Sequence, residues 1–262
     1  QVPAPYRRAS GHSCLVLVLT FIGIGIGIAA ATQLPKDSQW WMFLLLVGSP
    51  ILIGFIGAVM VSNRLDKNRI AEIGEALERR GFVFVTEGTG EEKAAFFQPM
   101  SELEGWAGLR DGAGRIDWMA AYRTQDARAA VFAHQYITGS GKTTTVHDST
   151  IFALIESTGQ PNGLAAHKPR IGEGRMYKRM ANRMDVGKDA FSKQWMVFGD
   201  PAAAHFLVPE VREALMSSPR GESLYVGPSF RAVGYKGILD AENVLKFIER
   251  SEAILRGRRP QP

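Results

Sequence analysis

Two long uncharged apolar runs near the N-terminus constrain the fold of this chain more than any other feature. The first extends from Cys14 to Ala31 and the second from Trp40 to Val61, with the short polar link TQLPKDSQ between them. Each run is close to the ~20 residues that a helix needs to cross a bilayer core. The sequence therefore predicts a transmembrane hairpin over residues 13–63, with spans at about 14–32 and 40–62, after an N-terminal tail at 1–12.

A cleaved signal peptide is the alternative for the first run. Arg7 and Arg8 would form its basic region, and the small residues of AAAT would form its cleavage site. Cys14 is the only cysteine, so an intrachain disulfide is excluded, and this fits a reducing compartment.

The distribution of Lys and Arg predicts an orientation for the hairpin. Basic residues precede the first run and follow the second, whereas the link between them carries only Lys36. The positive-inside rule then predicts a multi-pass protein of the bacterial inner (cytoplasmic) membrane, with both termini and the soluble domain in the cytoplasm. Trp40 and Trp41 are expected to be interface anchors, because indole rings favour the headgroup zone.

Small residues recur at helical spacing in both predicted spans. They are Gly23, Gly25, Gly27, Gly54 and Ala58. Such residues let helix backbones approach closely, so we expect them to be helix-packing positions. One interpretation is that the two spans pack on each other. The other is that one glycine face is left for a partner helix or a pigment-like cofactor.

The remainder of the chain predicts a stalk helix at 64–81, which ends at Gly81, and then a cytoplasmic α+β domain at 82–262. Runs rich in β-branched and aromatic residues indicate strands at 82–85, 115–122, 128–137, after the GSGK turn, and at 193–199. A helix capped by Asp200 and Pro201 is expected, with a kink or split at Pro209, and then a strand pair and a closing helix at 240–257. Neighbouring strands joined by short turns favour a mainly antiparallel sheet.

The stretch HQYITGSGKTTTVHD, residues 134–148, contains the second half of a phosphate-binding loop. A complete loop has a glycine at the position of Tyr136 and a helix after the Lys-Thr pair. Here the following residues, from Thr143 to Val146, are β-branched and resist helix formation. The sequence therefore favours a hairpin with its turn at Ser140 and Gly141, and we expect no nucleotide or other cofactor.

A two-residue turn in this hairpin would place His134 opposite His147. Two imidazoles across a ladder are weak candidates for metal ligands, because no third ligand is evident. The His147-Asp148 pair beside a serine is compatible with a hydrolase, but no G-x-S-x-G elbow is present. We predict no catalytic residue and no metal site.

A basic segment is the strongest surface feature of the predicted domain. It comprises Lys168, Arg170, Arg175, Lys178, Arg179 and Arg183. Anionic lipid is the simplest target for a tethered domain, and an acidic protein surface fits equally well, while nucleic acid is not favoured. A solvated charged loop is the alternative without a partner.

Four motifs occur along the chain: ERRGF at the end of a helix, Y-x-T-G-S-G-K at 136–142, FSKQWMVFG at 191–199 and the KFI of the last helix. They resemble those of an uncharacterised family of bacterial inner-membrane proteins with two N-terminal spans. The resemblance covers nearly the whole chain and implies a cytoplasmic domain with a Y-x-T-G-S-G-K hairpin. It brings no known activity, and the basic segment departs from the acidic, apolar stretch that it implies.

These features together predict a non-enzymatic accessory or scaffold subunit. The transmembrane hairpin would anchor it in the bacterial inner membrane, and it would stabilise a larger membrane complex, for example a photosynthetic or respiratory one. Its expected partners are the lipid bilayer and other membrane protein subunits. The alternative is a membrane-tethered nucleotide-dependent regulator or enzyme that uses the GSGK turn. Replacement of Lys142 by Ala separates the two, because only the alternative depends on that side chain.

Overall fold

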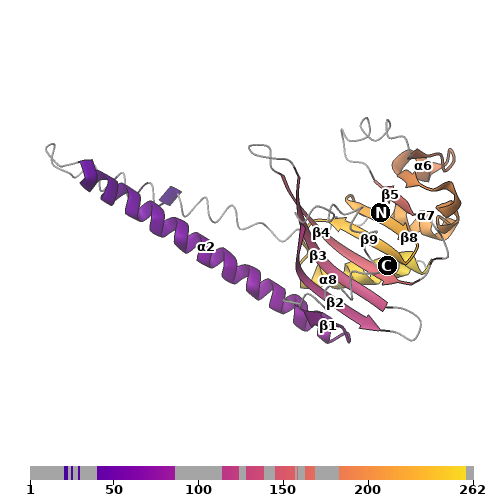
Figure 1. Cartoon of the computed structure of the whole chain (residues 1–262), viewed down its shortest axis with the longest axis horizontal. Helices are drawn as coiled ribbons and strands as arrows, with labels where there is room; N and C mark the ends of the chain where they lie inside the picture. The colour runs from indigo at the N-terminus through magenta and orange to yellow at the C-terminus, as the bar shows by residue number, and fades with distance from the viewer. Residues whose placement is uncertain are drawn as a thin grey trace. The chain divides into compact units, whose positions relative to one another are not determined.

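The computed structural model describes residues 40–85, 114–123, 128–138, 145–156, 163–168 and 183–257, together with 21, 22, 25, 29 and 158. Figure 1 shows the chain with its helices and strands labelled. It divides into two compact units, one formed by Ala9–Glu72 and the other by Ile73–Pro262 together with Gln1–Arg8.

The N-terminal part contains one long helix in the described residues. This helix, α2, spans Trp40–Glu78 and has 39 residues. No described helix combines the length and the apolar character that crossing a bilayer requires. The predicted fold class, a two-helix transmembrane hairpin followed by an α+β domain, is therefore wrong.

The uncharged run from Trp40 to Val61 suggested a separate span. The helix that forms there, α2, instead runs from the apolar stretch without a break through charged residues such as Arg64 and Lys67. Most of the first expected span, 14–32, lies outside the described residues. The inner-membrane, multi-pass localisation and the cytoplasmic orientation rested on the same two spans, so they are corrected with them.

The last turns of α2 pack into the second unit. Ile73 and Leu77 are fully buried there. A Cβ atom on Gly74 would lie 2.7 Å from the ring of Phe84, so the absence of a side chain lets the helix lie against this ring. The helix ends at Glu78, and Gly81, which was expected to be its stop, follows three residues later with a φ of 83°. The amide of Phe82 donates to the carbonyl of Leu77, which satisfies a helix-terminal acceptor.

The second unit is built on a nine-stranded sheet in which every described pair is antiparallel. The strands are β1 (Val83–Val85), β2 (Gly114–Arg123), β3 (Arg128–Thr138), β4 (Thr145–Ile155), β5 (Leu164–His167), β6 (Arg183–Met184), β7 (Met196–Gly199), β8 (Glu222–Gly227) and β9 (Phe230–Lys236). Their order across the sheet is β1-β2-β3-β4-β9-β8-β5-β7-β6. The first four strands form a meander, and β9 joins it to the remaining strands through β4.

Four short helical segments accompany the C-terminal strands. They are α6 (Ala190–Gln194), the 3₁₀ helix η4 (Pro201–Phe206), α7 (Pro209–Met216) and α8 (Ala241–Leu255). The amphipathic pattern of α8 puts Val244, Phe247 and Ile248 on its buried side, and the ring of Phe247 lies 6.5 Å from that of Tyr235 on β9. Helix α8 therefore covers the sheet face to which Tyr235 points.

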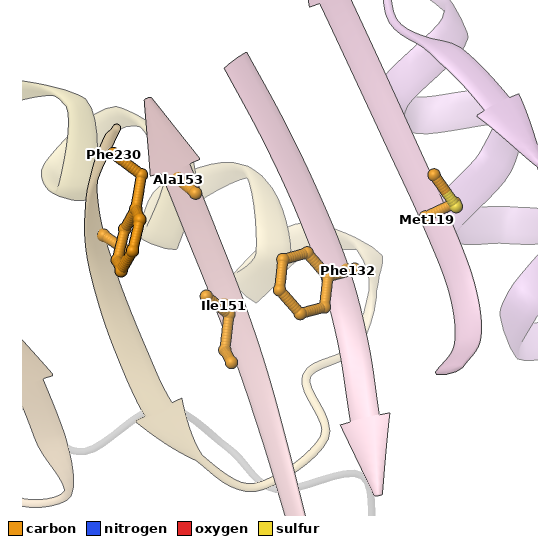
Figure 2. Close-up of a cluster of buried hydrophobic side chains, with 6 residues drawn as sticks. Met119, Phe132, Ile151, Ala153 and Phe230 are labelled. Atoms are coloured by element: carbon orange, nitrogen blue, oxygen red, sulfur yellow. The ribbon is translucent and has the colours of Figure 1, made fainter. Parts of the chain in front are cut away.

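The opposite face carries a second cluster of buried apolar side chains. It consists of Met119, Phe132, Ile151, Ala153, Phe230 and Ala232, with Ile155 and Tyr225 packed against it. Figure 2 shows these side chains on neighbouring strands of the sheet. Ile151 of this cluster is opposite Gly234 on β9, so the two residues share a face of the sheet. Tyr235 follows Gly234 and points to the other face, because successive strand residues alternate. The cluster therefore lies on the face away from α8.

Most of the expected strands occur where the residue pattern placed them. The expected split at Pro209 is also present, because η4 ends before it and α7 begins at it. The strands β5 and β6 fall where the residue pattern predicted no strand. The hairpin around the GSGK turn is confirmed, but its register differs from the expected one. His134 was expected opposite His147, whereas Thr138 pairs with Thr145 and His134 with Ser149.

Candidate functional site

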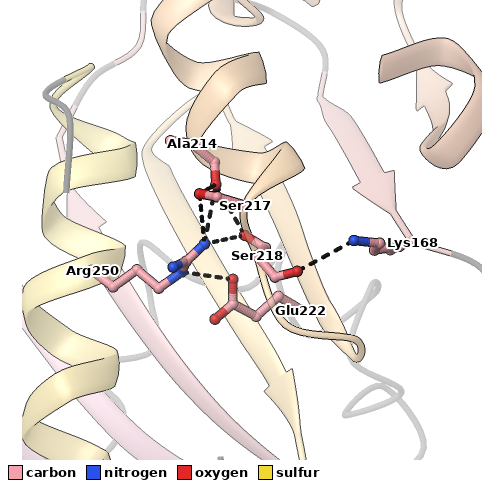
Figure 3. A network of polar contacts seen from close by, with 6 residues as sticks. All are labelled: Lys168, Ala214, Ser217, Ser218, Glu222 and Arg250. Carbon is pink, nitrogen blue, oxygen red and sulfur yellow. Dashed lines mark hydrogen bonds and ion pairs between the residues drawn. The ribbon is translucent and has the colours of Figure 1, made fainter. Parts of the chain in front are cut away.

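A buried ion pair lies where α7, β8 and α8 meet. The side chain of Glu222 is fully buried, and its Oε2 accepts a bond of 3.3 Å from Nε of Arg250. The Nη2 of Arg250 donates to the carbonyl of Ala214 at 3.1 Å and to the hydroxyl of Ser218 at 2.9 Å. Figure 3 shows the guanidinium between the end of α7 and the carboxylate. The positive charge of Arg250 thus meets both a buried anion and the carbonyl end of a helix.

Local sequence patterns explain how these residues come together. Glu222 begins β8, and its partner in the ladder is Tyr235, so its side chain points to the face covered by α8. Helix α8 is capped by Asp240, whose carboxylate accepts from the amide of Asn243. Arg250 lies one turn after Phe247 and one turn before Ile254, so its stem follows the buried side of the helix.

Lys168 adds a second cation to this region. Its Nζ donates to the carbonyl of Ser218 at 3.3 Å (Figure 3). Burial lowers the pKa of Lys168, and the positive charge of Arg220 lowers it further, as does that of Arg250, whereas Glu222 acts in the opposite direction. Lys168 therefore experiences the positive charges of Arg220 and Arg250 as well as the negative charge of the buried Glu222.

His167 and Ser223 form a hydrogen-bonded pair on the other face of the same strands. They are directly opposite each other on β5 and β8, and Nδ1 of His167 lies 2.8 Å from Oγ of Ser223. The imidazole lies edge-on to the ring of Tyr225, with 5.5 Å between the ring centres. In serine hydrolases the general base accepts the hydroxyl proton on Nε2. Because Nδ1 faces the hydroxyl here, the pair resembles a cross-strand clamp more than a nucleophile with its base.

The two histidines that were weak candidates for metal ligands are not opposite each other. His134 pairs with Ser149, and His147 pairs with Tyr136. His134 is buried, and this burial lowers its pKa to about 4, so the imidazole is neutral at pH 7. The hydroxyl of Ser149 donates to the carbonyl of His134. Over the described ranges, no three His, Cys, Asp or Glu side chains are grouped so that they could hold a metal ion.

The GSGK turn, residues 139–142, and the two threonines that follow it lie outside the described residues. Its flanks are described, and they are both strands: β3 ends at Thr138 and β4 begins at Thr145. A phosphate loop has a helix directly after its Lys-Thr pair, and the free amides of that helix hold the phosphates. The strand that begins two residues after Thr143 does not provide such amides.

The basic segment is described only at its two ends. Lys168 is half-buried and Arg183 is exposed on β6, whereas Arg170, Arg175, Lys178 and Arg179 lie outside the described residues. The structure therefore connects the start of the segment to the network around Glu222.

The small residues proposed for helix packing are described in part. Gly23 and Gly27 lie outside the described residues, and nothing lies within 4 Å of a Cβ atom built on Gly25. Gly54, Ala58, Trp40 and Trp41 belong to α2, and their side-chain environments are outside the description.

Large apolar side chains on α2 are exposed. We call Leu52, Ile56, Val59 and Met60 the α2 stripe, because residues three and four apart lie on one helix face. Leu52 is 59% exposed, Ile56 49% and Met60 67%. The stripe is thus an exposed apolar surface along one side of α2.

Sequence reasoning missed the pairing of Glu222 with Arg250 and the clamp between His167 and Ser223. A signal for the first was present, because Arg250 interrupts the apolar side of an otherwise regular amphipathic helix. A cation at such a position indicates a buried anionic partner.

Comparison with protein-family models finds no match. No curated protein matches the chain either. Among solved structures, the chain is similar to the crystal structure of the mycobacterial trehalose monomycolate transport factor A, TtfA, with 13% identity and a TM-score of 0.46. The similarity covers 74% of this chain and 97% of that chain. At this identity and TM-score the similarity carries no argument about function.

Proposed function

We propose that this chain is a non-enzymatic accessory or scaffold subunit that binds an apolar helix of a partner protein through the α2 stripe. The observation that carries the proposal is the exposure of Leu52, Ile56 and Met60, each about half or more, on one face of a 39-residue helix. Contiguous apolar surface of this kind marks an interaction site in folded proteins.

The partner is a helix because of the geometry of the stripe. Apolar side chains at i, i+4 and i+8 form a ridge along one side of α2, and such a ridge fits the groove of another helix. The sheet of the second unit supplies the folded body that a scaffold needs.

The experiment places a photocrosslinking amino acid at Met60 in the full chain in its native host. We expect crosslinks to an apolar helical segment of another protein, identified by peptide mass spectrometry. The matched control carries the same amino acid at Lys193, which is also exposed but lies on α6. Crosslinks only to a second copy of this chain, or none above the level at Lys193, would refute the proposal.

A second measurement ties the contact to the stripe. Ile56→Asp puts a charge into the apolar face and should abolish the crosslink from Met60. Asn68→Asp, at an exposed polar position on the other side of the same helix, should leave it intact. A scaffold also keeps its partner when Lys142 is replaced by Ala, because it does not depend on nucleotide.

A further inference from the structure

The α2 stripe leads to an exposed asparagine at the spacing of a two-helix coiled coil. Leu52 and Val59 are seven residues apart on one side of α2. Ile56 and Asn63 are also seven residues apart, and they alternate with the first pair. Residues that recur in steps of four and three form the narrow seam along which two helices interlock. The side chain of Asn63 is exposed, so it is open to the same partner as the stripe.

The residue types in this seam fit a single partner helix. In parallel two-helix coiled coils, one seam position favours β-branched residues and the other favours leucine. Ile56 occupies the first position and Leu52 the second, and Asn63 recurs at the position of Ile56. An asparagine at this position is a device that specifies register and the number of helices. The inference rests on the proposed function, because it takes the partner of the stripe to be a helix.

The apolar part of the stripe does not select a register by itself. Apolar burial is non-directional, so a partner helix displaced along Leu52, Ile56 and Val59 would bury a similar area. The seam position after Asn63 is Asp66, which forms an ion pair with Arg69 at 3.4 Å. That carboxylate is therefore engaged within α2 itself, and Asn63 is the polar group that the seam offers to the partner.

We propose that Asn63 fixes the register of the partner helix by hydrogen bonding to an Asn or Gln side chain on it. The carboxamide of Asn63 has donors and an acceptor, and a second carboxamide satisfies both kinds of group at once. Closing the seam removes water, so an amide opposite an apolar side chain loses its hydrogen bonds. A displaced partner is thereby disfavoured about tenfold or more against the matched register.

The test uses the full chain in its native host, with the photocrosslinking amino acid at Met60, and maps the crosslinked residue by peptide mass spectrometry. We expect one main site, within about two helical turns of an Asn or Gln. Asn63→Leu should keep the crosslinks but spread them to sites about three, four or seven residues away, so that the preference for the main site falls about tenfold. Asn68→Leu, the same change on the other side of α2, is the matched control and should keep the single site.

The outcomes separate this inference from the proposed function. A single site retained in Asn63→Leu, the loss of all crosslinks in that variant, or a crosslinked segment without a nearby Asn or Gln would overturn the role of Asn63 and leave the partner helix in place. Sites that spread equally in Asn68→Leu would overturn that role as well. The absence of crosslinks when both asparagines are intact would overturn the proposed function and this inference together.

Discussion

At the scale of single residues, the Glu222–Arg250 pair is the contact whose loss should matter most. A carboxylate removed from water is tolerated only when a cation and hydrogen-bond donors replace its solvation. The Glu222 side chain is fully buried and that of Arg250 is 13% exposed, so neither charge is well screened by solvent. The pair thereby links β8, α8 and the end of α7.

Replacing Arg250 by Met tests this contact. The variant keeps most of the apolar stem but leaves Glu222 buried without its cation, so we expect the free energy of unfolding to fall by about 3–5 kcal/mol. Urea denaturation at pH 7 measures the change. Arg256→Met removes a more exposed pair with Glu252 and should cost less than about 1 kcal/mol. If the two variants are equally stable, the buried pair does not have this role.

His134 predicts a pH dependence of stability. Its pKa is about 4 in the folded chain against 6.5 for the free side chain, so the unfolded chain binds the proton first as the pH falls. The stabilisation by neutral His134 is therefore complete above about pH 6.5 and is lost progressively down to about pH 4. Between pH 7 and pH 5 the shift corresponds to a loss of about 2 kcal/mol.

The measurement compares urea denaturation of the native chain and of His134→Asn at both pH values. The variant lacks the titrating imidazole, so its stability should fall by about 2 kcal/mol less over this range than that of the native chain. Equal losses in the two proteins would contradict the assignment to His134, whatever the absolute stability of the variant.

At the scale of secondary-structure elements, the junction of β5 and β7 requires a glycine. Gly199 ends β7 and pairs with Leu164 at a φ of 119°. This backbone conformation disfavours any side chain, and a Cβ atom would overlap the carbonyl oxygen of Gly163. The short strand β5 therefore depends on a residue outside its own span.

Gly199→Ala should lower the free energy of unfolding by at least about 2 kcal/mol, from backbone strain and overlap together. Gly187→Ala is the matched control, because Gly187 has a similar φ of 108° but open space around its Cα. It should cost only the strain, about 1 kcal/mol. Thermal denaturation of both variants separates the cost of backbone strain from the cost of the overlap with the Gly163 carbonyl oxygen. A smaller loss of stability in Gly199→Ala than in Gly187→Ala would show that the overlap does not contribute.

Sequence periodicity predicts elements well where the residues themselves carry the signal. The strands at 115–122 and 128–137 have β-branched and aromatic residues, and they correspond to β2 and β3. Strand β5, with the sequence LAAH, was missed because alanine has little strand preference and four residues show no period. The register of β3 with β4 was wrong because Ser140-Gly141 suggested a two-residue turn, whereas Thr138 pairs with Thr145.

The candidate site could not be predicted, because its members are far apart in the sequence. Lys168, Glu222 and Arg250 come from three separate segments, and only the packing of α8 on the sheet brings them together. The error over α2 has a different cause. An uncharged run was read as a membrane span on composition alone, although the helix that forms there continues into a charged segment.

At the scale of the whole molecule, the division into two compact units predicts independent folding of the second. The boundary lies between Glu72 and Ile73, within α2. The last two turns of this helix belong to the second unit through Ile73 and Leu77, which are fully buried. A fragment must keep these turns if it is to retain its core.

A fragment of residues 66–262 should fold cooperatively, as measured by circular dichroism during urea denaturation. A fragment of residues 82–262 lacks Ile73 and Leu77 and should be less stable by about 3–6 kcal/mol, from the loss of two buried apolar side chains. Comparable stability of the two fragments, or the absence of a cooperative transition in the longer one, would refute the boundary.

The order of strands in the sheet also has a consequence for the time at which the fold can form. Strands β1 to β4 pair with their neighbours in the chain, but β4 borders β9, which is the last of the described strands to be synthesised. Contacts between residues far apart in sequence are slow to form, because a long loop must close first. On the ribosome, the meander would therefore expose the open side of β4 until β9 emerged. The nascent chain should need protection from aggregation most during that interval.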